Sequence, residues 1–194
     1  MFGESNGKTK GKPLSRVGRK PIPVPPEVQI SLDYSQVTVK GPKGTLIQKL
    51  HPEVKVILED SIVLVERLSS KKFHRAVHGL TRSLIANAIV GVTDGYTRSL
   101  DLMGVGYRAQ QNGTNVVLNV GYSHSVEIKS VEGVSITVEG NNKIHVQGCS
   151  KEHVGGVAAR IRKVRPPNAY KAKGIKYSDE VLRLKPGKTA ARKA

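Results

Sequence analysis

The residues whose types and spacing point most clearly to a chemistry form a basic run close to the C-terminal end of the chain. Between Arg162 and Lys176 there are six lysine or arginine residues and no acidic residue. Cations without acidic neighbours are typical of segments that contact the phosphates of a nucleic acid. We predict an extended segment on which Lys171 and Lys173 point to one side. Gly174, which has no side chain, is expected to let phosphate approach the backbone closely.

The predicted contact surface extends to both sides of that run. A helix before it is expected to present Arg160 and Lys163 away from its apolar stripe. Tyr170 or Tyr177 could stack on a base or hydrogen-bond to a sugar. The complete set of residues predicted to bind nucleic acid is Arg160, Arg162, Lys163, Arg165, Tyr170, Lys171, Lys173, Gly174, Lys176, Tyr177, Lys185 and Lys188.

Other motifs lack the surroundings that their chemistry requires. Gly104-Val-Gly-Tyr-Arg-Ala matches a dinucleotide-binding fingerprint, but the residues after it read as a hairpin turn instead of a helix. His74 and His78 have the spacing of a zinc-binding pair, yet Arg75 stands where a metalloprotease has glutamate, and no third ligand is evident. Tyr122-Ser-His124 lacks the elbow of a serine nucleophile. We therefore predict that the chain is not an enzyme and uses no metal and no cofactor.

The excess of positive charge is concentrated at the two ends of the chain. The 194 residues include 32 Lys+Arg and 15 Asp+Glu, which gives a net charge of +17. Residues 1–22 contribute +5 and residues 151–194 contribute +10, so 15 of the 17 excess charges lie in these two segments. Such a concentration favours a polyanionic partner over a general adaptation of the surface to solvent.

The sequence argues against a membrane protein and against a secreted protein. No apolar run approaches the length of about 18–20 residues that a membrane span needs. No segment near Met1 combines a basic start with an apolar stretch, so we predict no secretory signal. The single cysteine, Cys149, cannot form an internal disulfide and fits a reducing compartment.

An internal repeat with a period near 80 residues organises the chain. Residues 54–59 match residues 134–139, and after a two-residue insertion residues 62–65 match residues 144–147. Apolar and polar residues alternate in these segments, which predicts strands. The turns between them are expected at Glu59-Asp60 and at Gly140-Asn-Asn. A further strand pair is expected at Thr97–Gln110 and Val116–Tyr122, turned by Asn112-Gly113.

A helix is predicted after each repeated strand pair. For the first, Ser69 or Ser70 is expected as the N-cap and Gly91 as the end. Its expected apolar stripe is Phe73, Val77, Leu80, Leu84 and Ala88. The second is expected to begin near Ser150 and to end before Pro166-Pro167, because proline lacks an N–H. Its expected buried residues are Val154, Val157, Ala158 and Ile161.

The predicted fold class is α+β, with two homologous domains from an internal duplication. Each domain is expected to be an antiparallel-rich sheet with one packed helix. We predict a basic flexible extension at residues 1–14, repeats at 15–95 and 96–177, and a basic tail at 178–194. Residues 1–14 and roughly 179–194 are expected to be mobile in the free protein, because they hold little apolar material to offset ordering entropy.

Six motifs, which occur in order between Ser15 and Tyr177, carry a family resemblance. The chain resembles the bacterial and organellar form of large-subunit ribosomal protein L-six. The motifs are Ser15-Arg-Val-Gly-Arg-Lys-Pro-Ile, Val39-Lys-Gly-Pro-Lys-Gly, His78-Gly-Leu-Thr-Arg, Gly104-Val-Gly-Tyr-Arg-Ala, Asn119-Val-Gly-Tyr-Ser-His and Lys173-Gly-Ile-Lys-Tyr. The family's acidic-Pro-Tyr-Lys-Gly stretch reads Asn168-Ala-Tyr-Lys-Ala172 here.

The resemblance implies a structural protein that binds 23S-type rRNA near the sarcin–ricin loop and the base of the acidic stalk. The implied partners are this rRNA, neighbouring large-subunit proteins and translational GTPases nearby, without a membrane and without homo-oligomers. The second domain and the tail would make most of the RNA contact, and the first would act as a spacer or protein-contacting body. The implied location is the large ribosomal subunit, in a bacterial cytoplasm or a chloroplast stroma.

Two other classes of function stay open at this point. A free RNA-processing or RNA-modifying enzyme with basic tails would need a perturbed acid, a thiol or a metal cluster. A DNA-architectural protein would need a helix that reads a groove or a wedge that intercalates. Neither feature is recognisable in the sequence.

Overall fold

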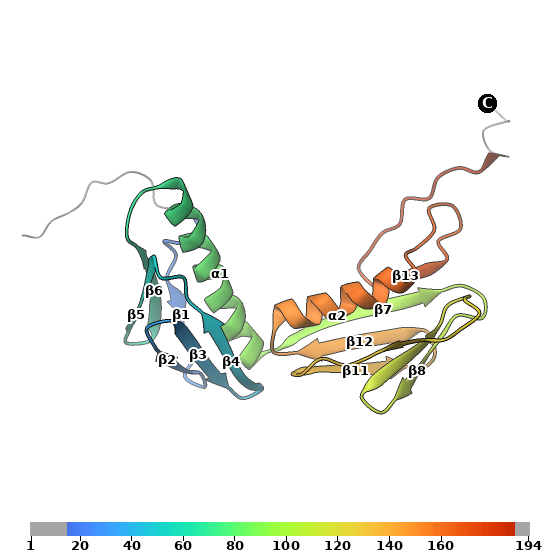
Figure 1. Ribbon diagram of the computed structural model, residues 1–194, viewed down its shortest axis with the longest axis horizontal. Coiled ribbons are helices and arrows are strands. Elements are labelled where there is room, and N and C mark those ends of the chain that lie inside the picture. Colours follow the sequence, from blue (N-terminus) through green and yellow to red (C-terminus); the bar gives the residue numbers. More distant parts are fainter. Residues whose placement is uncertain (1–14, 189–194) are drawn as a thin grey trace, which may run out of the picture. The chain divides into compact units, whose positions relative to one another are not determined.

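The structure is a computed structural model that describes residues 15–188. These residues divide between Thr93 and Asp94 into two compact units, and each unit combines antiparallel sheets with one long helix (Figure 1). The first unit contains β1 (Ile22–Pro23), β2 (Gln29–Leu32), β3 (Gln36–Gly41), β4 (Gly44–Lys49), β5 (Val54–Glu59), β6 (Ile62–Arg67) and α1 (Lys72–Thr93). The second contains β7 (Tyr96–Met103), β8 (Arg108–Asn112), β9 (Asn115–Asn119), β10 (Val126–Ile128), β11 (Val134–Glu139), β12 (Lys143–Gly148), α2 (Lys151–Val164) and β13 (Gly174–Tyr177).

In the first unit α1 packs on two three-stranded sheets, of order β1-β6-β5 and β2-β3-β4. Alternate residues of the strands face the helix, so Val37 and Val39 of β3 and Val63 of β6 are fully buried. Ile85 and Val92 of α1 are equally buried on the other side of this core. The helix therefore stabilises both sheets through one apolar stripe.

In the second unit α2 covers one face of a four-stranded sheet of order β11-β12-β7-β13 (Figure 1). The core contains Leu100 of β7, Ile144 of β12, Ile161 of α2 and Ile175 of β13, all fully buried. A second sheet, of order β10-β9-β8, completes this core with Leu118. The predicted α+β class, with two repeats of sheet and helix, is confirmed.

The strand prediction from the repeat is confirmed by the register. Residues 54–59 and 134–139 form β5 and β11, and each pairs with the strand that follows it through turns at Asp60 and Gly140.

The second helix also agrees with its prediction. The Ser150 hydroxyl accepts a hydrogen bond from the His153 backbone N–H at 3.3 Å, and the helix ends at Val164, just before the prolines. Its buried residues are the four that were expected.

The first helix differs from its prediction at its end and in its buried stripe. It continues through Gly91, which is buried inside it, to Thr93, and Gly95 then takes the left-handed conformation with φ +75°. Phe73 and Leu80 are more than half exposed. The buried face lies about one position further along and consists of Val77, His78, Thr81, Ile85, Ala88, Ile89, Gly91 and Val92.

The single strand predicted at 97–110 is wrong. A turn at Gly104–Gly106 divides it into β7 and β8, which belong to different sheets. The turn predicted at Asn112-Gly113 is observed one residue later, because Asn112 pairs with Asn115.

Part of the segment that was predicted to be mobile contacts the second unit. Asp179 pairs with Arg98 at 2.9 Å, and the Lys185 backbone N–H donates to the Ala169 carbonyl at 2.9 Å. The first few tail residues therefore pack against the second unit. The extension 1–14 and residues 189–194 lie outside the described residues. In residues 15–188, no helix has the length and apolarity to cross a membrane.

Candidate nucleic-acid interface

A tight turn at residues 168–173, which we call the Asn168 turn, follows the prolines at the end of α2. The Asn168 Oδ1 atom accepts hydrogen bonds from the backbone N–H groups of Tyr170 at 2.8 Å and Lys171 at 3.3 Å. The backbone closes the turn, since Asn168 N–H donates to the Lys173 carbonyl and Ala172 N–H to the Asn168 carbonyl. Ala172 has φ +58°, an uncommon value for a residue other than glycine. The expectation of an extended segment here is wrong, because the Asn168 side chain folds it back.

The turn forms one wall of a concavity of about 440 Å³ in the second unit. Lys171 and Lys173 both line it, as the sequence predicted for a shared side, although a turn rather than a strand brings them together. Arg165 supplies a third cation. No acidic residue is among the residues that line it, which are Tyr107, Tyr122, Arg165, Pro166, Pro167, Asn168, Lys171 and Lys173. The concavity is therefore suited to an anion.

Arg165 is held against the wall by two tyrosines. Its guanidinium lies 4.9 Å from the centroid of the Tyr122 ring, which is a cation–π geometry. Hydrogen bonding to Tyr122, and then to Tyr107, raises the pKa of Arg165, so the side chain is positively charged at any physiological pH. The Tyr122 hydroxyl donates to the Val164 carbonyl at 2.9 Å and so satisfies one of the last carbonyls of α2.

Several further predicted cations face solvent without an acidic partner. Arg160 and Lys163 are exposed on α2, as predicted, and Lys185 and Lys188 are exposed in the tail. Within residues 15–188, none of these four side chains, nor Arg165, Lys171 or Lys173, forms an ion pair with a carboxylate. Tyr170 is also exposed, at 58%. These residues form the outward-facing part of the predicted set.

Three of the predicted residues are engaged inside the second unit instead. Arg162 donates two hydrogen bonds to Glu180, and Lys176 lies 4.0 Å from the Asp101 carboxylate. The Tyr177 ring has the guanidinium of Arg162 at 5.6 Å from its centroid. These contacts occupy the groups that would have faced a nucleic acid.

The interpretation of Gly174 as an opening for phosphate is wrong. Gly174 is buried in β13 and has φ +143°. A Cβ atom there would lie 2.6 Å from the Pro166 carbonyl oxygen. The glycine is needed because the strand passes directly over the Pro166–Pro167 backbone.

Sequence reasoning missed five residues of the concavity, namely Tyr107, Tyr122, Pro166, Pro167 and Asn168. The two tyrosines belong to Gly104-Val-Gly-Tyr-Arg-Ala and Asn119-Val-Gly-Tyr-Ser-His, two of the motifs that carry the family resemblance. Their appearance in two similar Gly-Tyr motifs was the available signal. Asn168 stands where the family has an acidic residue, and asparagine is a common turn former.

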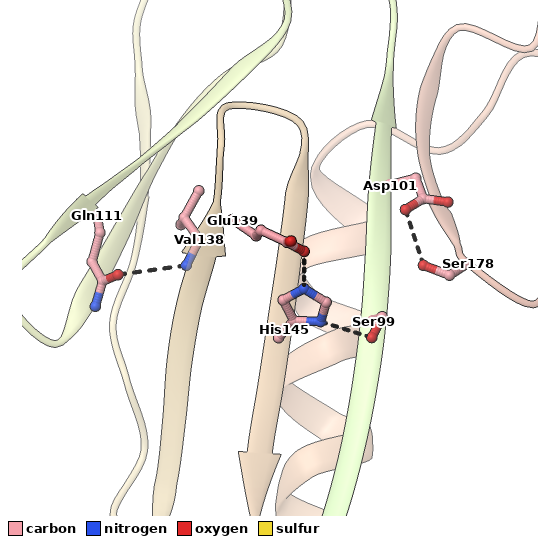
Figure 2. A network of polar contacts seen from close by, with 7 residues as sticks. All are labelled: Ser99, Asp101, Gln111, Val138, Glu139, His145 and Ser178. Carbon is pink, nitrogen blue, oxygen red and sulfur yellow. Dashed lines mark hydrogen bonds and ion pairs between the residues drawn. The ribbon is translucent and has the colours of Figure 1, made fainter.

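A polar network covers the face of the four-stranded sheet that is turned away from α2 (Figure 2). His145 on β12 joins Ser99 on β7, with 2.8 Å between Oγ and Nδ1, to Glu139 on β11, with 3.0 Å between Nε2 and Oε2. The hydrogen bond from His145 lowers the pKa of Glu139. On the same face Ser178 donates to Asp101, and at the outer edge of β11 the Val138 backbone N–H donates to Gln111 of β8.

The Ser99–His145–Glu139 trio resembles a catalytic triad in composition but not in geometry. In a serine hydrolase Nε2 faces the serine and Nδ1 faces the carboxylate, whereas the two nitrogen atoms are exchanged here. None of the three residues lines the concavity. We interpret the trio as cross-strand pairing that stabilises the sheet.

The two histidines of the first helix form polar contacts with neighbouring groups of the protein. His78 is buried, and its Nε2 donates to the Val65 carbonyl at 2.8 Å, so Nδ1 accepts from the Ser15 hydroxyl at 2.9 Å. His74 contacts Ser69 through Nδ1 and Glu53 through Nε2. In the described part of the chain there is no group of three or more potential metal ligands.

The fold and the site together define a class: a duplicated α+β protein whose second repeat presents a cationic concavity with no acidic lining residue. Comparison with known proteins gives the particular family. The family model described as Ribosomal protein L6 matches residues 24–95 and 103–178, once in each unit. The chain belongs to the ribosomal protein L6 family, and this confirms both the resemblance and the prediction that it is a structural protein and not an enzyme.

Similar relatives include bacterial proteins named "Large ribosomal subunit protein uL6". That of Carboxydothermus hydrogenoformans is 56% identical over 179 residues, which cover 92% of this chain and 98% of the relative. That of Caldicellulosiruptor bescii is 55% identical over 175 residues, with 90% and 96% covered. That of Halalkalibacterium halodurans is 53% identical over 176 residues, with 91% and 99% covered.

Proposed function

We propose that this chain is a structural constituent of the large ribosomal subunit that binds 23S-type rRNA, chiefly through its second unit. The name shared by the relatives, and the coverage of nearly their whole length, support the assignment to the large subunit. The cationic surface supports RNA as the ligand, since phosphate neutralisation supplies most of the sequence-independent affinity of nucleic-acid-binding proteins.

The observation that carries this proposal is the separation of the cations into two groups. Arg162 and Lys176 are neutralised by Glu180 and Asp101 inside the fold. Within the described residues, no carboxylate pairs with Arg160 or Lys163 of α2, or with Arg165, Lys171 or Lys173 beside the Asn168 turn. If these charges served only solubility, unpaired cations would not be expected to cluster around one concavity. The phosphate groups of RNA are the anionic partners that these cations lack within the protein.

The resemblance supports a more specific location. The second unit would contact the rRNA near the sarcin–ricin loop and the base of the acidic stalk, and would support the region where translational GTPases bind. The first unit would act mainly as a spacer or as a body that contacts neighbouring proteins. Its role in the complex is then mechanical, because it positions the second unit without supplying most of the RNA affinity.

Directed hydroxyl-radical cleavage tests this location. The variant Cys149→Ala removes the only cysteine, and Lys185→Cys in that background places a single thiol on the exposed tail. An iron chelate attached there, in reconstituted large subunits, should cleave rRNA near the sarcin–ricin loop. The matched variant Glu59→Cys carries the same chelate at the exposed end of β5 in the first unit and should give a different cleavage pattern. Cleavage from position 185 at distant sites only would overturn the proposed location.

A further inference from the structure

We propose that the concavity beside the Asn168 turn holds a single unpaired nucleotide of the rRNA, with its phosphate on the three cations and its base against the tyrosine and proline rings. This inference rests on the proposed function and names the part of the RNA that the site would take. The sequence indicated phosphate contacts for the lysines and stacking or sugar contacts for Tyr170 or Tyr177, whereas the concavity provides a place for a base beside other tyrosines, Tyr107 and Tyr122.

The size and lining of the concavity select the ligand. A volume of about 440 Å³ admits one nucleotide but not a double helix. Its lining combines three cations with aromatic and proline rings, and it includes no acid. A nucleotide has the same two parts, an anionic phosphate and a flat apolar base. Inorganic phosphate alone would leave the ring surfaces unused.

The phosphate end of the site is fixed before any ligand arrives. Lys171 and Lys173 stand on a turn that the Asn168 side chain and two backbone hydrogen bonds hold closed. Arg165 is held by its contact with the Tyr122 ring. Because these cations are already positioned, binding would cost little ordering of the backbone.

The base end depends on the position of Tyr107. A Cβ atom added at Gly104 or at Gly121 would lie 3.1 Å from the Tyr107 ring, so two glycines on different segments make room for it. The ring packs against the core of the second unit on one side and contributes to the concavity on another. A ring that is immobilised in this way provides a stacking surface, which is how proteins hold unstacked bases of single-stranded RNA.

Ultraviolet crosslinking of the full chain to transcribed 23S-type rRNA, followed by mass spectrometry, tests the inference. A base in contact with an aromatic ring should leave a mononucleotide adduct on Tyr107 or Tyr122. The variant Lys171→Gln/Lys173→Gln should lower the yield of this adduct about tenfold at equal fractions of bound RNA. The matched variant Lys40→Gln/Lys49→Gln removes two exposed charges of the first unit, outside the concavity, and should leave the yield unchanged.

The outcomes separate this inference from the proposed function. Normal rRNA binding with adducts only outside the concavity would overturn the inference and leave the proposed function standing. Failure to bind rRNA would overturn the proposed function. In that case, titration of the labelled protein with adenosine 5′-monophosphate and with ribose 5-phosphate decides the inference. Ring signals of Tyr107 and Tyr122 that shift with the first ligand only would support a base site, and equal shifts with both would overturn it.

Discussion

The guanidinium of Arg162 forms a two-pronged hydrogen bond with the carboxylate of Glu180, with Nε and Nη2 lying 3.0 and 2.6 Å from its two oxygen atoms. Arg162 is in the last turn of α2, and Glu180 follows β13. The Tyr177 backbone N–H also donates to the same carboxylate at 3.2 Å. This one acidic residue therefore fixes the start of the basic tail to the helix.

Glu180→Gln is expected to destabilise the second unit in a pH-dependent way. The hydrogen bond from Arg162 lowers the pKa of Glu180, so the carboxylate stabilises the fold above the ordinary glutamate pKa of about 4.3. That contribution is lost as the pH falls through the lowered value. Chemical denaturation at pH 7 should show a loss of about 0.5–1 kcal/mol in the variant. The two proteins should converge as the pH falls through the lowered pKa of Glu180, and a difference that stays constant with pH would contradict this role.

Gly174→Val is expected to lower the free energy of unfolding of the second unit by about 2–4 kcal/mol. The added Cβ would meet the Pro166 carbonyl oxygen at 2.6 Å, and the residue would have to keep φ +143°. The control is Gly156→Ala on α2, where an added Cβ has nothing within 4 Å. This control should raise helix stability by about 0.5–1 kcal/mol. Equal melting temperatures for both variants would show that the close approach of β13 to the prolines is not needed.

Lys171→Ala/Lys173→Ala is expected to weaken rRNA binding mainly through the loss of two phosphate contacts. If both contacts are complete, the slope of log affinity against log salt should shrink by about 1.4 to 1.8. The control Lys40→Ala/Lys49→Ala removes two exposed charges of β3 and β4 in the first unit. In this control the slope of log affinity against log salt should change much less. Titrations at several salt concentrations measure both, and an unchanged slope in the first variant would move the phosphate contacts to Arg160 and Lys163.

Ser15→Ala is expected to lower the free energy of unfolding of the first unit by about 1–2 kcal/mol. The Ser15 hydroxyl donates to Nδ1 of the buried His78 and accepts from the Gly18 backbone N–H, so its removal leaves a buried ring nitrogen without a partner. Ser31→Ala on exposed β2 is the control. Hydrogen exchange of α1 amides provides the readout for this unit alone. Unchanged exchange would mean that water replaces the hydroxyl.

The regular elements could be predicted because their signals are local. Alternation in β5 and β11, the Ser150 cap and the Pro166 stop each act within a few residues, and they appear in the structure where they were expected. The buried face of α1 differs from the predicted apolar stripe because it includes the polar residues His78 and Thr81. The helical periodicity of the buried positions can be recognised in the sequence only when this histidine and this threonine are counted as buried residues.

The concavity could not be predicted in detail because it joins three distant segments. Tyr107, Tyr122 and Lys171 come from different loops, and no pairwise spacing indicates that they meet. The Asn168 turn was missed because Ala172, in a left-handed conformation, has no turn preference of its own. The burial of Gly174 likewise depends on a strand crossing that only the tertiary structure shows.

The place of β13 at the end of its sheet has a consequence for the chain during synthesis. Until residues 174–177 emerge, the outer edge of β7 would offer unpaired N–H and C=O groups to any other strand, which is a template for aggregation. The first unit protects the corresponding edge with Pro23 in β1, which has no N–H to offer. A chain cut short before Gly174 would lose this protection together with the basic tail. By covering this edge, β13 would help to keep the newly made protein soluble before it binds RNA.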